Sequence, residues 1–126
     1  MSSLKRLSPS LQQSLSQRSL LKVIAGLSNF EHDSVKQIAK ASSYGDADLL
    51  DIACDPYLVQ LAVENSKIPI CVSAVEPHRF LDAVDAGASM IEIGNFDSFY
   101  VKGRYFDAIE VLAITRETRR LLPDIP

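Results

Sequence analysis

Short apolar runs alternate with amphipathic stretches along most of this sequence. Each apolar run is four to eight residues long, the usual length of a buried strand, and several contain β-branched residues. Between the runs, apolar residues recur at three- and four-residue intervals, which predicts helices. The predicted strands are Leu20–Leu27, Leu49–Cys54, Ile70–Val75 and Met90–Ile93. The pattern therefore predicts a strand followed by a helix, four times in succession.

Local start and stop signals support the predicted helices. Ser8-Pro9 offers an N-cap and a proline at the first helical position. Asp55-Pro56 and Glu76-Pro77 pair an acidic cap with a proline in the same way. The predicted helices are Pro9–Gln17, one from a cap at Asp33 or Ser34 to Gly45, one starting at Pro56, one from Pro77 to Gly87, and Phe106–Leu122.

Strands separated by helices pair in parallel, which leaves two architectures: a small doubly wound sheet or a (β/α)₈ barrel. A complete barrel needs about 250 residues, and this chain has 126. Four units, with a further strand about to begin at 124–126, indicate half of a barrel. The predicted fold is α/β: four consecutive βα units with parallel strands (residues 20–126), preceded by a short N-terminal helix or extension (residues 1–19).

Polar residues interrupt one face of each predicted strand. Side chains alternate along a strand, so the apolar faces should pack on helices and the mixed faces should point to the barrel interior. Gly26, Cys71 and Gly94 fall on the mixed faces. The same alternation places four polar side chains around one axis at comparable depths: Lys22, Asp51, Ser73 and Glu92.

Two interpretations of these interior residues remain open. In the first, Lys22 neutralises Asp51 or Glu92, and the cluster only fills the interior and specifies strand pairing. In the second, Lys22 is a catalytic base or Schiff-base nucleophile whose reactivity the two carboxylates, Asp51 and Glu92, adjust. Lys22 lies early in its strand, whereas barrel chemistry occurs at the carboxyl ends of the strands. This position favours the structural interpretation for Lys22 more than for the carboxylates.

The carboxyl ends of the predicted strands offer further ligand-binding candidates. Helix capping would explain two acidic residues in this set without a ligand, and turn hydrogen bonds would explain two others. The aromatic residues of 96–100 make the last loop suitable for covering a small ligand, and packing beneath the rest of the barrel would explain them equally. The candidates at this rim are Asn29, Asp55, Glu76, Asn95 and Asp97, and Ser73 of the interior is a further ligand-binding candidate.

Composition narrows the classes of partner. A net charge of −3 gives no reason to expect nucleic acid, and no apolar run reaches the length of a membrane span. The two cysteines, Cys54 and Cys71, are predicted to be reduced and buried; with the two histidines they have no zinc-site spacing. We therefore predict no metal site. The first thirty residues lack acidic side chains, which is typical of a transit peptide or of the amphipathic helix already predicted.

Several segments resemble the hypothetical chloroplast reading frame twenty-three family of cyanobacteria and algal plastids. The segments that carry the resemblance are Lys22–Leu27, Asn29-Phe30, Asp51–Pro56, Val72–Pro77, Ile91–Tyr100 and Thr115–Pro123. The resemblance implies an aldolase-type (β/α)₈ barrel of unestablished activity, located in the cyanobacterial cytoplasm or the plastid stroma. Members of the family are about twice as long as this chain, so we expect it to self-associate or to pair with a C-terminal half-barrel.

Two functions follow as expectations. The first is an enzyme-like half-barrel that binds a small metabolite, phosphorylated ones included, at the carboxyl ends of its strands. The second is a non-catalytic binding or regulatory protein whose strand carboxylates serve structure alone. Neither the residues nor the resemblance identifies a cofactor.

Overall fold

A parallel sheet of four strands, in the order β1-β2-β3-β4, forms the centre of the protein. The computed structural model describes residues 3–94 and 96–126. Each strand pairs with the next one in sequence, so the sheet contains no reversal of strand order. The predicted succession of four βα units after a short N-terminal helix is confirmed. The strands are β1 (Lys22–Gly26), β2 (Leu49–Ala53), β3 (Ile70–Ala74) and β4 (Met90–Ile93).

The helices begin and end close to the predicted positions. Two short elements were not expected: a 3₁₀ turn at the N-terminus and a single helical turn inside the aromatic loop after β4. In the described part of the chain, every helix is too short or too polar to traverse a bilayer. The helices are η1 (Ser3–Arg6), α1 (Pro9–Ser16), α2 (His32–Tyr44), α3 (Pro56–Asn65), α4 (Arg79–Asp85), α5 (Asp97–Tyr100) and α6 (Ala108–Leu121).

The capping residues correct two of the sequence predictions. Glu31 caps α2 by accepting hydrogen bonds from the backbone amides of Asp33 and Ser34, so neither of those residues is the cap. Asp55 caps α3 as predicted, accepting from Leu58 N at 3.0 Å. Glu76 does not repeat this device, because α4 begins only at Arg79 and its cap position makes no side-chain hydrogen bond.

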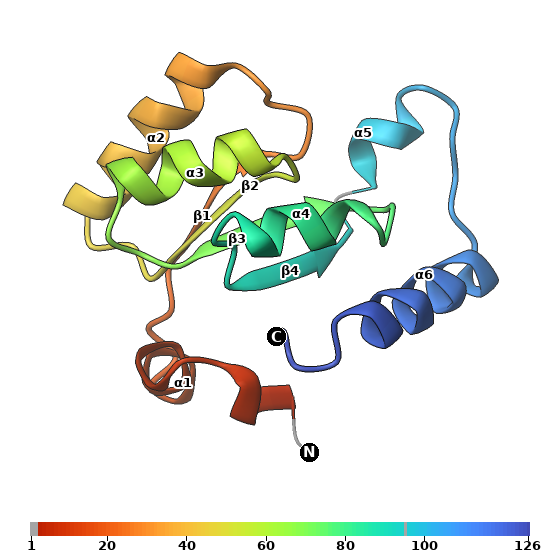
Figure 1. Ribbon diagram of the computed structural model, residues 1–126, viewed down its shortest axis with the longest axis horizontal. Coiled ribbons are helices and arrows are strands. Elements are labelled where there is room, and N and C mark those ends of the chain that lie inside the picture. Colours follow the sequence, from red (N-terminus) through yellow and green to blue (C-terminus); the bar gives the residue numbers. More distant parts are fainter. Residues whose placement is uncertain (1–2, 95) are drawn as a thin grey trace.

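One face of the sheet is covered by helices. Helices α2, α3 and α4 lie side by side over it in Figure 1, each against the strands of its own unit. The side chains between the two layers are apolar and fully buried, which gives the protein a continuous core. This core on the outer face of the sheet includes Leu50, Ile52, Ile70 and Val72 from the strands and Phe80 from α4.

The other face carries the predicted polar residues and a separate small apolar cluster. Leu11 of α1 packs against Leu49 and Cys71 near the amino-terminal ends of β2 and β3. The N-terminal helix therefore closes this end of the inner face. Val23 and Ala25 of β1 pack against the core on the outer face, as the alternation predicted. A register shift lies between Ile24 and Gly26, so that Gly26 pairs with Ile52.

Candidate functional site

The predicted interior residues lie together on the inner face. Lys22, the first residue of β1, places its ammonium 2.8 Å from Asp51 Oδ2 on β2 and also in contact with Glu92 Oε2 on β4. Ser73 on β3 donates a hydrogen bond to Asp51 Oδ1 at 2.7 Å. All four strands thus contribute to one hydrogen-bonded cluster, as the alternation predicted. We call Lys22, Asp51, Ser73 and Glu92 the inner cluster.

Burial differs sharply within the inner cluster. The side chain of Asp51 is 3% exposed and that of Lys22 is 24% exposed, whereas that of Glu92 is 38% exposed. Ser73 is as buried as Asp51. Asp51 and Ser73 therefore form the floor of the cluster, and Glu92 is the carboxylate that solvent and solutes can reach.

Opposing effects set the protonation of the two innermost charged groups. Burial alone lowers the pKa of Lys22, but the hydrogen bonds to Asp51 and Glu92 outweigh it and hold that pKa above its ordinary value of 10.5. Burial raises the pKa of Asp51 above its ordinary value, with a smaller rise from the charge of Glu92, against the opposing hydrogen bonds from Lys22 and Ser73. Lys22 is therefore a firmly held cation.

The contact between Lys22 and Glu92 reveals the shape of the inner face. The two residues come from the outer strands, three strand spacings apart, which is about 14 Å across a flat sheet. Side chains stand roughly perpendicular to a flat sheet, so these two would not meet there. Their contact is natural when the inner face is concave, because side chains on the inside of a curve converge. The inner cluster therefore lies at the bottom of a concave surface.

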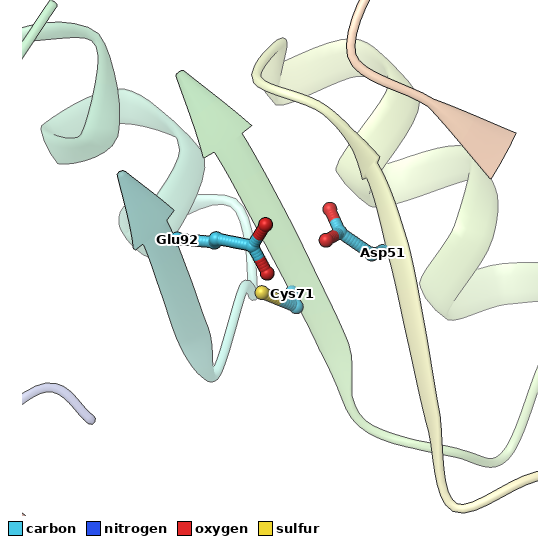
Figure 2. A group of neighbouring side chains, drawn as sticks. All are labelled: Asp51, Cys71 and Glu92. Carbon is cyan, nitrogen blue, oxygen red and sulfur yellow. The ribbon is translucent and has the colours of Figure 1, made fainter. Parts of the chain in front are cut away.

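Asp51, Cys71 and Glu92 extend from three neighbouring strands, as Figure 2 shows. One potential ligand atom of each lies within 4.8 Å of those of the other two. Such a trio has ligand types that could hold a metal ion, and the spacing of residues along the sequence did not indicate it. Two features of the chain argue against it. The Lys22 ammonium already contacts both carboxylates, and burial raises the pKa of the Cys71 thiol, which keeps the sulfur protonated.

Both cysteines are free and buried as predicted. Burial raises the pKa of the Cys54 thiol to about 11, and its sulfur lies 3.3 Å from the backbone carbonyl of Arg79. Neither thiol is therefore an activated nucleophile.

Two of the predicted rim residues serve local structure. The side-chain amide of Asn29 donates to the Ala25 carbonyl at 3.2 Å and to Ser34 Oγ at 3.0 Å, which fixes the loop after β1. Asp55 is occupied by its cap of α3. The structure does not bring these side chains into the inner cluster.

The remaining described rim residues, Glu76 and Asp97, follow β3 and β4. Glu76 is exposed and lines a cavity of about 440 Å³ together with Phe99, Arg104 and Phe106. Asp97 is exposed and begins α5. Asn95 lies outside the described residues.

Sequence reasoning missed the cation in this rim cavity. The Arg104 guanidinium lies 4.0 Å from the ring centre of Phe106 and pairs with Glu110 at 2.6 Å. Glu110 and the cap Asp107 also form a capping box at the start of α6. The sequence signal was Asp107 followed three residues later by Glu110, which is typical of a helix start. No comparable sequence pattern indicates the contact of Arg104 with the Phe106 ring.

The inner cluster has the chemistry of a recognition site for hydrogen-bond donors. Ionised carboxylates only accept hydrogen bonds, and the reachable group is Glu92. Two carboxylates face one ammonium, so the charged groups of the cluster carry a net charge of −1 when all are ionised. A ligand that brings a hydroxyl or an ammonium group would complement this arrangement.

Comparison with known proteins places the chain in a family. The profile of a family described as "Protein of unknown function (DUF561)" matches residues 6–126. The chain belongs to this family. It is 49% identical over 113 residues to the "Uncharacterized protein ycf23" of Cyanophora paradoxa, a match that covers 89% of this chain and 46% of that protein. The protein of the same name from Porphyra purpurea is 42% identical over 117 residues, covering 93% of this chain and 44% of that protein.

The chain spans about half the length of the curated relatives it matches. The resemblance noted in the sequence is thus confirmed at the level of the family. The names of these relatives state no activity.

Proposed function

We propose that this member of the DUF561 family forms the first half of an aldolase-type (β/α)₈ barrel and binds a small metabolite on its concave face. Three observations support the barrel. The strands follow one another without the reversal of a doubly wound sheet, the inner face is curved enough for β1 and β4 side chains to meet, and the relatives are about twice as long.

Glu92 carries the proposal of a binding site. It is the one carboxylate of the inner cluster that is substantially exposed, and it is linked through Lys22 to the buried Asp51–Ser73 pair. Such a supported acceptor is already oriented before a ligand arrives, which reduces the entropy cost of binding. The ligand class we propose is a small polar metabolite whose hydroxyl or amine group donates to Glu92.

Lys22 serves this proposed site as a fixed cation. Its raised pKa leaves little free amine, so it is unsuited to act as a Schiff-base nucleophile in this arrangement. Its role is to hold Glu92 and Asp51 in place. We therefore propose binding and positioning roles for Lys22, Asp51 and Glu92 in place of the catalytic roles first considered.

Phosphorylated metabolites remain within the proposed class, provided that the phosphate is held away from the inner cluster. The net negative charge of the cluster repels a phosphate, and barrels commonly hold one in the loops after strands seven and eight. Glu76, Asp97 and Asn95 at the carboxyl ends of the strands are the proposed sources of additional polar contacts.

Thermal-shift screening tests the proposed site. The panel contains small sugars, amino acids and their phosphorylated forms, and each is tested on the wild-type chain, on Glu92→Gln and on Glu64→Gln. Glu64 is an exposed carboxylate of α3, on the helix-covered side of the sheet rather than the side of the cluster, and serves as a matched charge control. We expect a compound to raise the melting temperature of the wild type and of Glu64→Gln more than that of Glu92→Gln. An equal rise in all three would contradict the role of Glu92.

The alternative function is a non-catalytic protein in which the carboxylates serve structure alone. The observation that favours it is the full pairing of Asp51, which receives hydrogen bonds from both Lys22 and Ser73. If Glu92→Gln lowers stability and leaves ligand binding unchanged, this alternative is supported instead.

Two proposals concern the protein in its cell. From the resemblance we propose the cyanobacterial cytoplasm or the plastid stroma as its location. We also propose that the chain self-associates or pairs with a C-terminal half-barrel, because Ile24 on the inner face is 57% exposed and β1 and β4 are sheet edges. Light scattering tests the association; a monodisperse monomer at high concentration that unfolds cooperatively would contradict it.

A further inference from the structure

The edge of β4 differs from the strands in the middle of the sheet. Every residue of β2 and β3 is buried, whereas all residues of β4 are only partly buried. β4 pairs with β3 on one side. Its other side is an edge of the sheet, with which a further strand can pair.

The last residues of the chain occupy the beginning of this edge. The backbone amide of Ile91 donates to the carbonyl of Pro126 at 3.0 Å. Figure 1 shows the end of the chain returning from α6 toward β4. The end of the chain is therefore hydrogen-bonded to the start of β4 after the crossover through α6.

An equivalent hydrogen bond occurs between β2 and the residue that immediately precedes β3. The amide of Leu50 on β2 donates to the carbonyl of Pro69 at 3.1 Å, and Pro69 immediately precedes β3. Both prolines follow an isoleucine, in Ile68-Pro69 and Ile125-Pro126. The first Ile-Pro pair is hydrogen-bonded to β2 and leads into β3. The second pair is hydrogen-bonded to β4 in the same way.

Arg119 holds the segment that reaches this edge. Its guanidinium nitrogen Nη1 donates to the carbonyls of Leu122, Pro123 and Ile125 at 3.1, 3.0 and 2.8 Å. The neighbouring Arg120 instead pairs with Glu117 on its own helix. Three hydrogen bonds from one side chain fix the course of the chain from the end of α6 to Pro126.

We propose that the free edge of β4 is the docking site of a fifth parallel strand that continues directly from Pro126. Its occupant is the segment that follows the matched region in the longer relatives, of which this chain spans 46% and 44%. By the register of β2 and β3, the first residue of the new strand lies opposite Ile91. The amide of Ile93 then donates to the carbonyl of its second residue, because parallel ladders are evenly spaced.

This inference rests on the barrel in the proposed function and adds the register and the residues that guide the next strand. It is tested by amide hydrogen exchange without any ligand. One protein is the 126-residue chain; the other carries, after Pro126, the segment that follows the matched region in the Cyanophora paradoxa relative. We expect the Ile93 amide to exchange about 100-fold more slowly in the extended protein. Equal Ile93 exchange in both folded proteins would overturn the proposal.

A second comparison uses the 126-residue chain alone and covers the case in which the extended protein does not fold. We expect Ile91 to exchange more slowly than Ile93, and Arg119→Met to accelerate exchange at Ile91, while Arg120→Met leaves it unchanged. If Ile91 exchanges as fast as Ile93 in the wild type, the terminal segment is not bound to β4 and the proposal is wrong. Failure of every compound to shift the melting temperature would contradict the metabolite site and leave these exchange results as they are.

Discussion

The two faces of the four-stranded sheet differ in the kind of side chain that they bury. On the outer face, apolar side chains such as Ile52 and Val72 are completely buried beneath α2, α3 and α4. On the inner face, Asp51 is just as buried, yet it is charged and depends on Lys22 and Ser73 for its hydrogen bonds. One face removes apolar surface from water, and the other removes a carboxylate from water and then pairs it.

This difference shows where function is best sought. Burying apolar groups stabilises the fold directly, whereas a buried ion pair often contributes little net stability, because desolvation offsets the attraction. Stability alone therefore does not account for the inner cluster, and the ligand proposed at Glu92 would account for it. The following predictions test whether the outer face mainly stabilises the fold and the inner face mainly serves binding.

The largest effect is expected on the outer face. Phe80→Ala removes a fully buried ring between β3 and α4 and leaves a cavity, so unfolding should become easier by about 3–5 kcal/mol. Urea denaturation measures the change. Tyr44→Ala, which truncates an aromatic side chain that is 88% exposed, is the control and should change stability by less than about 0.5 kcal/mol. Similar losses in both variants would mean that the outer face is not the core.

A smaller loss is expected from Asp51→Asn on the inner face. Asparagine keeps the shape of the side chain but removes the negative charge that faces Lys22, which still retains Glu92. We expect a loss of about 2 kcal/mol, the scale of a hydrogen bond to a charged group. The same urea titration measures it. A variant that is more stable than the wild type would show that the buried pair strains the fold.

Alkaline pH tests the Lys22 cation. Its pKa is raised in the folded state, so its contribution is complete below the ordinary value of 10.5 and declines as the pH rises above it. We expect the stability difference between wild type and Lys22→Met to shrink between pH 10.5 and 11.5, by about 1 kcal/mol. Denaturation at a series of pH values measures this trend. A difference that grows with pH would contradict the assignment.

The smallest change in stability is expected from Glu92→Gln. Because the Glu92 side chain is 38% exposed, solvent screens its pair with Lys22, and the loss should be less than about 1 kcal/mol. Thermal denaturation of this variant beside Glu64→Gln measures it. A loss as large as that of Asp51→Asn would place Glu92 among the structural residues and weaken the case for a ligand.

The sequence predicted the strands and the inner cluster for the same physical reason. Side chains alternate with a period of two, so Lys22, Asp51, Ser73 and Glu92 could be assigned to one face once the strands were placed. The proximity of Cys71 to both carboxylates needed the register between strands, which a period alone does not supply.

Other features depended on local geometry that patterns do not encode. The register shift after Ile24, which pairs Gly26 with Ile52, is one of them. Glu76-Pro77 looks like Asp55-Pro56, but the first pair forms a turn before α4 and only the second begins a helix. The reach of Arg119 to three carbonyls depends on how the chain folds back after α6.

Amide chemical-shift mapping tests most directly the central claim that the concave face is the ligand-binding face. The isotope-labelled chain is titrated with the sugars, amino acids and phosphorylated forms of the thermal-shift panel. We predict that a binding compound moves the amide signals of Asp51, Ser73, Glu92 and Gly94 most, and moves them less in Glu92→Gln. Signals that move only in α2, α3 and α4, or equally in wild type and variant, would contradict the claim.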